Sequence, residues 1–394
     1  MITTINNKHN KLNVPNLRFK EFQGEWEKTK FGDIVIVVGG GTPDTNTSQY
    51  WNGKIQWFTP SEIGRNKYVY NSVRTISEEG LNKSSAKLLP IGTILLSSRA
   101  TVGECSINKK ECTTNQGFQS LIPKENISNE FVYYLIQTKR KDLIRKSCGS
   151  TFLEISANEV RKIVVSIPTI KEQDKIAKLL SLLDERIATQ NKIIEDLKKL
   201  KCAIIEKVYS EIQGQEYLYG QLFDVVNERN KQMEYSNILS ASQEKGMVNR
   251  DDLNLDIQFE RSNINNYKIV KKGDYVIHLR SFQGGFAFSD KLGVCSPAYT
   301  ILRPNSILEY GYLSNYFTSQ RFIKSLVLVT YGIRDGRSIN VDEWLRMKIT
   351  IPPKEHQQYI VKVIGIFERK IEDEEAYAAQ LSIQKQYLLR QMFV

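Results

Sequence analysis

The stretch Ile167 to Tyr209, IPTIKEQDKIAKLLSLLDERIATQNKIIEDLKKLKCAIIEKVY, recurs in altered form from Ile351 to Phe393 as IPPKEHQQYIVKVIGIFERKIEDEEAYAAQLSIQKQYLLRQMF. The second copy lies 184 residues after the first, and both begin with Ile-Pro. Sequence identity is modest, but the apolar residues of both copies recur at alternating spacings of three and four. Such spacing places one apolar stripe along a helix. The repeat therefore predicts two long amphipathic helices.

Each predicted helix starts just after a proline, which suits a helix entry, and about 40 residues at 1.5 Å each give a rod of roughly 60 Å. Two such rods in one chain most simply pack on each other, and if they do so antiparallel the globular domains lie at opposite ends. Two unrelated surface helices are the alternative. Lys201 and Lys385 interrupt the stripe at matching places, as do Gln190 and Glu374. The residues expected at the helix-pair interface are Ile176, Leu180, Leu183, Ile187, Leu197, Ile204, Ile360, Ile364, Phe367, Ile371, Leu381 and Leu388.

The segments before the two rods also correspond to each other. Short strand-like runs alternate with turn clusters there, which is typical of mixed α/β domains. We align residues 91–99 with 272–280, and 31–33 with 222–224, so the spacing drifts between 181 and 191 before settling at 184. Repetition on this scale indicates a duplicated unit with pseudo-two-fold symmetry.

The predicted fold is therefore α/β (α+β), with two mixed α/β domains separated by a pair of long antiparallel coiled-coil helices. Residues 1–24 are rich in Asn and Lys and are expected to form a loosely ordered arm. The remaining boundaries are expected at 25–166 for the first domain, 167–213 for the first helix, 214–350 for the second domain and 351–394 for the second helix.

Composition narrows the class of partner. Lys and Arg number 55 against 44 Asp and Glu, a formal charge of +11, which favours a polyanionic partner, either nucleic acid or an acidic protein surface. Five cysteines are widely spaced without a CxxC pair, which favours a reduced, cytoplasmic protein over a disulfide framework. No run approaches the length of an apolar membrane span.

No enzyme motif is complete in this sequence. The segment Gly39-Gly-Gly-Thr42 lacks the GK[ST] of a phosphate-binding loop, so we interpret it as a tight turn. The three histidines, His9, His278 and His356, are isolated, and we expect no metal site. The sequence therefore favours a binding protein over an enzyme, with no catalytic residue and no cofactor of its own.

Polar and aromatic residues near the repeated segments are the candidate DNA contacts, since their donors and acceptors match base edges and phosphates. The alternative is that they are ordinary surface residues. A wider set around these positions includes Gln56, Thr59, Tyr70, Arg74 and Ser97. The candidates are Thr42, Trp57, Ser61, Lys67, Tyr68, Ser98, Arg99, Asn115, Gln116 and Gln119 in the first domain, and Ser242, Gln243, Arg280, Gln283, Ser296, Tyr299, Arg334 and Arg337 in the second. Arg99 and Arg280 are favoured because both follow a strand-like run at equivalent places.

The chain resembles the specificity (S) subunits of type I restriction-modification systems. The resemblance covers nearly the whole chain and is carried by the order of several short motifs together with the duplicated plan. These are Val14-Pro-Asn-Leu-Arg-Phe19, Gly24-Glu-Trp26, Gly40-Gly-Thr-Pro43, Tyr50-Trp51, Ile94-Leu-Leu-Ser-Ser-Arg99 and the Ile167-Pro/Glu172-Gln173 helix entry. The second helix entry departs from this pattern, with Lys354-Glu-His-Gln357 in its place.

This resemblance implies two target-recognition domains that each recognise half of a bipartite double-stranded DNA site, with the helices setting the spacing. It also implies two modification subunits that carry S-adenosylmethionine and methylate adenine, and two restriction subunits that use ATP and Mg. A coiled-coil scaffold without sequence-specific DNA binding is the rival hypothesis. A salt-dependent shift on mixed-sequence duplex DNA separates the two.

Overall fold

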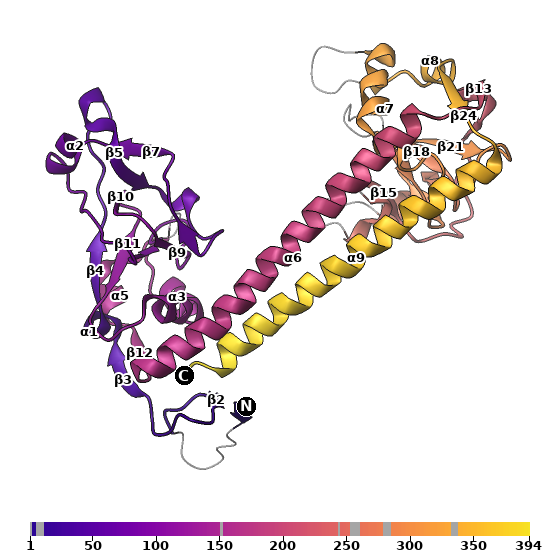
Figure 1. Ribbon diagram of the computed structural model, residues 1–394. Helices are drawn as coiled ribbons and strands as arrows, with labels where there is room; N and C mark the ends of the chain where they lie inside the picture. Colours follow the sequence, from indigo (N-terminus) through magenta and orange to yellow (C-terminus); the bar gives the residue numbers. More distant parts are fainter. Residues whose placement is uncertain are drawn as a thin grey trace. The chain divides into compact units, whose positions relative to one another are not determined.

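The computed structural model describes residues 2–4, 12–149, 153–242, 245–252, 261–278, 285–331 and 338–394. Two compact units divide the chain. The first contains Met1–Gln190 and Tyr377–Val394, and the second contains Asn191–Ala376. Because the division falls within both long helices, each unit combines one globular domain with part of each helix (Figure 1).

Two sheets organise the first globular domain. Five strands in the order β4-β11-β8-β9-β6 form one sheet, and three strands in the order β10-β5-β7 form the other. Most neighbours are antiparallel, whereas β6 with β9 and β10 with β5 run parallel. The strands are β1 (Ile2–Thr4), β2 (Leu17–Phe19), β3 (Glu27–Lys30), β4 (Val35–Gly39), β5 (Trp51–Phe58), β6 (Tyr68–Val69), β7 (Arg74–Ile76), β8 (Ile94–Leu96), β9 (Cys105–Asn108), β10 (Cys112–Thr114), β11 (Gln119–Pro123) and β12 (Val164–Ile167). The helices are α1 (Phe31–Ile34), α2 (Glu78–Asn82), α3 (Asn129–Thr138), α4 (Arg140–Arg145), α5 (Ala157–Arg161) and the long α6 (Ile170–Ser210).

The core of this first unit joins the five-stranded sheet, α3 and the ends of both long helices. Helix α3 contributes six consecutive buried residues, because it is enclosed by the sheet on one side and α6 on the other. The long helix α9 (Lys354–Gln391) is followed by Phe393, whose ring stacks on Phe131 with centroids 5.2 Å apart and meets Trp26 edge-on at 6.3 Å. The helix pair is thus fixed to the domain by shared apolar burial.

The segment expected to be a loosely ordered arm is in fact partly built into this unit. Arg18 on β2 is buried and forms two 2.8 Å hydrogen bonds through Nε and Nη2 with the carboxylate of Glu172, which is 1% exposed. The indole of Trp26 donates to the same carboxylate at 3.3 Å. The expectation of loose order was therefore wrong for residues 12–24. Two oppositely charged groups are stable when buried only if they stay paired, so the contact between Arg18 and Glu172 holds this segment against α6.

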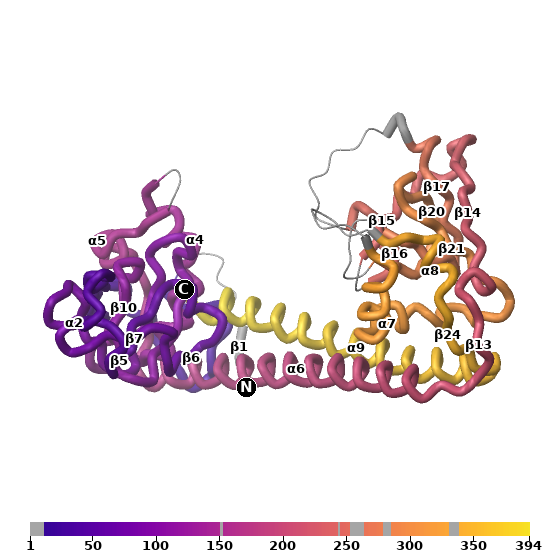
Figure 2. Tube along the Cα trace, turned by 90° about the horizontal axis from the view of Figure 1, so that it is seen from above, coloured from indigo at the N-terminus to yellow at the C-terminus, as the bar shows by residue number. Residues whose placement is uncertain are grey.

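The second globular domain repeats the first with a smaller set of helices. Its four-stranded sheet has the order β14-β21-β18-β19, which matches β4-β11-β8-β9, and β13 pairs with β24 as β3 pairs with β12. Figure 2 shows β13 and β24 where α6 ends and α9 begins. The strands are β13 (Gln215–Leu218), β14 (Phe223–Val226), β15 (Leu239–Ser242), β16 (Gly246–Asn249), β17 (Lys268–Val270), β18 (Tyr275–Ile277), β19 (Phe286–Phe288), β20 (Gly293–Cys295), β21 (Thr300–Pro304), β22 (Thr330–Tyr331), β23 (Ser338–Ile339) and β24 (Lys348–Ile351), and the helices are α7 (Gln320–Ser325) and α8 (Val341–Leu345).

The pairing of strands in the two sheets corrects one of the two alignments made between the first and second domains. Val35 pairs with Pro123 and Phe223 pairs with Pro304, so Phe223 is equivalent to Val35, which lies 188 positions earlier. The match of residues 31–33 with 222–224 was therefore wrong, and the true equivalent is 219–221, where Tyr219 is as buried as Phe31. The match of 91–99 with 272–280 is confirmed as far as residue 278, because Ile94 and Tyr275 occupy the same register position in their sheets.

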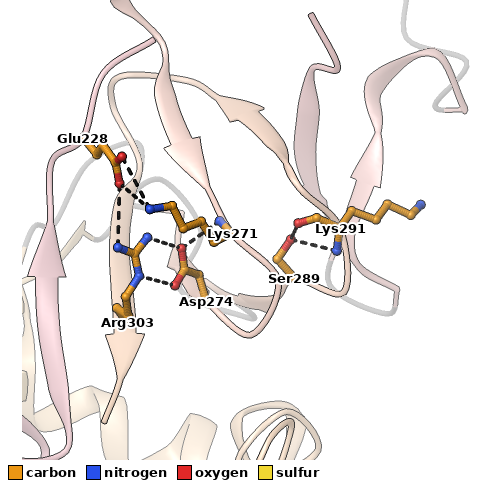
Figure 3. A network of polar contacts seen from close by, with 6 residues as sticks. All are labelled: Glu228, Lys271, Asp274, Ser289, Lys291 and Arg303. Carbon is orange, nitrogen blue, oxygen red and sulfur yellow. Dashed lines mark hydrogen bonds and ion pairs between the residues drawn. The ribbon is translucent and has the colours of Figure 1, made fainter. Parts of the chain in front are cut away.

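A polar network fixes one turn of the second domain (Figure 3). The guanidinium of Arg303 donates through Nε and Nη2 to the carboxylate of Asp274, each at 2.9 Å, and the backbone N–H of Lys271 donates to the same carboxylate at 2.8 Å. Glu228 then pairs with the Lys271 ammonium at 3.1 Å. Asp274 is 1% exposed, so these partners offset the loss of its hydration.

Both long helices were predicted correctly. Helix α6 has 41 residues and α9 has 38, and none of the twelve predicted interface residues is exposed. Within the first unit the two helices run antiparallel, with Lys385 paired to Asp184 at 2.6 Å; within the second they do the same, with Lys201 paired to Glu368 at 3.0 Å. The lysines that interrupt the apolar stripe therefore form ion pairs between the helices. No helix among the described residues has the length and apolar character needed to cross a bilayer.

Equivalent glutamines attach each long helix to its own domain. Gln173 donates to the Pro168 carbonyl at 2.9 Å and accepts from the backbone N–H of Ser128 at 3.0 Å. Gln357 donates to the Pro352 carbonyl at 3.0 Å and accepts from the backbone N–H of Glu309 at 2.8 Å. Both are 1% exposed, and their duplicated contacts show that the halves share one plan of attachment.

Candidate functional site

The ends of several strands meet at one edge of the first domain. Strand β4 ends at Gly39 opposite Gln119, the first residue of β11, and Ser97 after β8 bridges to Phe118. Strands β5 and β10 run parallel and end together, with Phe58 beside Thr114. This register gathers four loops at one place. We call residues 39–44, 59–62, 97–103 and 115–119 the recognition edge.

Backbone hydrogen bonds join these loops to each other. Gly41 N–H donates to the Thr114 carbonyl at 2.8 Å, Asn115 N–H to Phe58 at 3.0 Å, and Ser98 N–H to Gly117 at 2.8 Å. A Cβ on Gly40 would lie 1.9 Å from the Asn115 carbonyl oxygen, so only glycine permits this approach. The glycine run expected to form a tight turn therefore serves close packing between two loops.

Several predicted contact residues do lie on the recognition edge. Thr42 Oγ1 donates to Gln116 Oε1 at 2.5 Å, which brings two candidates from distant sequence positions together. Ser61 is exposed, and the side-chain oxygen of Asn115 accepts from Gly117 N–H at 2.9 Å. Gln119 Oε1 is buried and has no hydrogen-bond partner among the described residues. Thr42, Ser61, Asn115 and Gln116 offer donors and acceptors of the kind that base edges require, whereas the buried oxygen of Gln119 does not.

Two other candidates are buried and cannot contact DNA in this conformation. Trp57 is 4% exposed, and its indole N–H donates to the Gly41 carbonyl at 2.9 Å. Ser98 is fully buried beneath the same edge. The prediction that these two residues contact DNA was therefore wrong, and in this structure they support the loops.

Lys67 and Tyr68 are also directed inward. The Lys67 ammonium lies 2.9 Å from the Glu130 carboxylate and 3.0 Å from the Ser181 hydroxyl of α6. The Tyr68 hydroxyl donates to Glu130, and burial raises the pKa of Tyr68. Burial alone would raise the pKa of Glu130, but its hydrogen bonds from Tyr68 and Lys67 outweigh that effect and lower it. The prediction that Lys67 and Tyr68 contact DNA was therefore wrong as well, since these side chains join this part of the domain to α3 and α6.

Arg99 lies on the recognition edge, but its charge is already partnered. Its Nε is 2.9 Å from Glu154 Oε1, and the two side chains are 45% and 44% exposed. A DNA contact by Arg99 would compete with this ion pair. Its role as a direct contact stays a prediction.

The described part of the second domain places three candidates around an equivalent edge. Ser296 and Tyr299 precede β21, and Ser242 ends β15; all three are partly exposed. The Tyr299 ring lies 5.3 Å from that of His278, which follows β18. Gln243, Arg280, Gln283, Arg334 and Arg337 lie outside the described residues.

The chain belongs to the family described as type I restriction modification DNA specificity domain, whose model matches residues 23–199 and again 215–382. One relative is the MjaIX specificity subunit of a type I restriction enzyme from Methanocaldococcus jannaschii, 36% identical over 207 residues. That alignment covers 51% of this chain and 48% of the relative, so the chain spans about half the length of this relative, as it does of the EcoR124I/EcoR124II specificity subunit from Escherichia coli, which is 32% identical over 190 residues.

Two solved structures share the fold. The S subunit of a type I restriction-modification system from M. genitalium aligns with 97% of this chain and 99% of its own, with a TM-score of 0.55 and 15% identity. A chain from a study of complex assembly and conformational transition of the type I R-M system aligns with 92% of this chain and 96% of its own, with a TM-score of 0.61 and 16% identity. The duplicated fold of the specificity subunits is therefore present here.

Proposed function

We propose that this chain is the DNA sequence-recognition subunit of a type I restriction-modification complex. Each globular domain recognises one half of a bipartite, asymmetric DNA site, while the helix pair sets the spacing and docks the methyltransferase subunits. The observation that carries this proposal is the duplication of one specificity domain within one chain, with each copy attached to a long helix by an equivalent buried glutamine.

The recognition edge supplies the chemistry for such contacts. Thr42, Asn115 and Gln116 combine hydroxyl and amide groups on loops fixed by backbone hydrogen bonds, which suits selection among base edges. The net charge of +11 adds attraction to phosphates that does not depend on sequence. Direct contacts then select the site, and general charge holds the duplex.

We further propose that catalysis belongs to the partners. Two modification subunits would bind S-adenosylmethionine and methylate adenine, and two restriction subunits would use ATP and Mg to translocate and cleave DNA. The chain itself would bind none of these cofactors. Support comes from the family, and from a structural relative whose title concerns assembly of a type I R-M complex.

Mapping of methylated adenines tests the proposal. The chain is expressed with its modification subunits, and genomes with and without the chain are compared. A bipartite motif that appears only with the chain supports the proposal. Methylation independent of the chain, or S-adenosylmethionine turnover by the purified chain alone, contradicts it.

A binding measurement tests the scaffold alternative. The complex is titrated with mixed-sequence duplex at about 50 and 200 mM salt. A DNA-binding subunit loses affinity steeply as salt rises, whereas a scaffold binds duplex at neither concentration.

A further inference from the structure

Residues 70–74 follow β6 of the first domain and end at Arg74, the first residue of β7, and they combine exposed side chains with a fixed backbone. Tyr70 is 55% exposed, Val73 is 87% exposed, and Arg74 is exposed as well. An apolar side chain as open as Val73 has no role in the core of this domain. The segment therefore presents an aromatic, an aliphatic and a cationic group to solvent.

Buried and partly buried neighbours hold this backbone in place. Gln56 Oε1 accepts from Ser72 N–H at 2.7 Å, and Ser72 Oγ accepts from Trp57 N–H at 2.9 Å. Glu62 accepts from Val73 N–H at 2.7 Å through one carboxylate oxygen and from Thr59 through the other. Glu62 thus joins the segment directly to the recognition edge.

The guanidinium of Arg74 is oriented by two tryptophans. Its central carbon lies 3.6 Å from the ring centroid of Trp51 and 5.5 Å from that of Trp57. Both indoles donate to the loop that carries Thr42, Trp51 to the Asp44 carbonyl at 3.0 Å and Trp57 to Gly41. The stacked arginine is therefore held beside the recognition edge, and stacking leaves the edge of its planar fork open to hydrogen bonding.

Arg74 differs from Arg99 in whether its charge is already paired. Arg99 is paired with Glu154, whereas no ion pair joins Arg74 to another described residue. Cation–π stacking orients the charge but leaves it un-neutralised. A pre-oriented, unpaired guanidinium loses little side-chain entropy on binding and no existing ion pair.

We propose that Arg74 and Val73 form a specificity element of the first target-recognition domain. Arg74 donates from its fork to O6 and N7 of a guanine in the first half-site, and Val73 contacts the apolar face of an adjacent base pair, such as a thymine methyl. This inference rests on the proposed function and adds the residues that carry part of its selectivity.

The test uses the chain assembled with its modification subunits, with mapping of methylated adenines as the readout. Arg74→Ala is expected to lower methylation of the native site roughly 10- to 100-fold and to relax one guanine position of the first half-site only. Arg74→Lys is expected to relax the same position, because a point charge cannot reproduce a bidentate contact. Recognition of the second half-site stays unchanged and serves as the internal control for folding.

Val73→Ala and Lys162→Ala complete the set. Val73 makes no core contact, so its truncation is expected to leave thermal stability unchanged while it weakens selection at a base pair next to the guanine. Lys162 follows α5 where β3 pairs with β12, away from the recognition edge. Its ammonium is paired with Glu159 at 2.8 Å, and its loss removes one positive charge, as loss of Arg74 does. We expect Lys162→Ala to leave the motif intact.

Three results would overturn the inference. Arg74→Ala with an unchanged motif and unchanged methylation shows that Arg74 does not contact DNA. A uniform loss across sequences that Arg74→Lys restores shows a phosphate contact. If Val73→Ala keeps its selectivity and Arg74→Lys keeps the motif, neither residue contributes to specificity. Failure of the wild-type complex to methylate any bipartite motif instead contradicts the proposed function.

Discussion

The ammonium of Lys385 lies 2.6 Å from the carboxylate of Asp184, and the same carboxylate accepts a hydrogen bond from the Tyr134 hydroxyl at 2.7 Å. One acidic group therefore connects both long helices with α3 of the first domain. The equivalent pair in the second unit, Lys201 with Glu368, is wider at 3.0 Å, and its carboxylate is 42% exposed against 20% for Asp184.

This difference in exposure predicts that loss of the two ion pairs lowers the free energy of unfolding by unequal amounts. Asp184→Asn should lower the free energy of unfolding by about 1–2 kcal/mol, because a partly buried charge-assisted network is lost. Glu368→Gln should cost less than about 1 kcal/mol, since solvent already screens that pair. Urea titrations of the full chain, with hydrogen exchange along α9, measure both effects. Equal losses in the free energy of unfolding would show that solvent exposure does not determine how much these ion pairs contribute.

The buried pair between Arg18 and Glu172 predicts a larger effect. Glu172→Gln should cost about 3–5 kcal/mol, because it leaves the Arg18 guanidinium buried without its counter-charge. At the matching position of the second helix, His356 is exposed, so His356→Ala is the control and should change stability by less than about 0.5 kcal/mol. Thermal unfolding compares the two variants. A Glu172→Gln chain as stable as wild type would mean that the pair is open in solution.

The network at Glu130 predicts a response to acid. Its pKa in the folded chain is lower than usual, so the carboxylate stabilises the fold above the unfolded pKa of about 4.3, and this contribution disappears as pH falls through the folded pKa. Glu130→Gln should flatten the loss of stability between pH 5 and 3, whereas Glu125→Gln, at an exposed position, should not. Melting temperatures of wild type and both variants, measured across this pH range, test the prediction. Parallel curves for Glu130→Gln and wild type would contradict the network.

Cysteine reactivity should follow burial. Burial raises the pKa of Cys105, Cys112 and Cys295 to about 12, whereas Cys148 and Cys202 are exposed. Iodoacetamide at pH 8 should therefore modify the two exposed thiols first, and the other three only after unfolding. Mass spectrometry of tryptic peptides locates the adducts. Early modification of a buried thiol would reveal local opening of its strand.

The duplication predicts the behaviour of a shortened chain. A fragment that ends after Gln213 keeps the first domain and α6 but lacks Phe393, which covers Trp26 and Phe131. In a homodimer, Tyr209 of the second copy can replace Phe393, and its Lys201 can replace Lys385 beside Asp184. We expect a dimer, since burial of each large apolar side chain contributes roughly 1.5 to 3 kcal/mol before entropy costs.

Sedimentation of the fragment measures its state of assembly, and methylation mapping with modification subunits measures its selectivity. The expected motif is an inverted repeat of the first half-site. A stable monomer would contradict the pairing of the helices. A dimer that directs methylation to the original asymmetric site would contradict independent recognition by the first domain.

The sequence by itself determined the long helices and the duplication, because both depend on local periodicity and spacing. Apolar residues at three and four positions specify a helix face wherever the partner lies. It also located part of the recognition edge, since Thr42, Asn115 and Gln116 follow strand ends and must lie on loops. The glutamines of the helix entries were visible as a repeated motif, although their partners were not.

Tertiary structure alone decided which polar residues face solvent. Lys67, Trp57 and Ser98 belong to residue types common at DNA interfaces, yet the fold covers each of them with residues distant in sequence. Arg74 was named only in the wider candidate set and Val73 not at all, and only the pairing of β5 with β7 places Trp57 beside Arg74. Burial depends on contacts between distant segments, whereas helix periodicity is written within one segment, and this is why the first required the structure and the second did not.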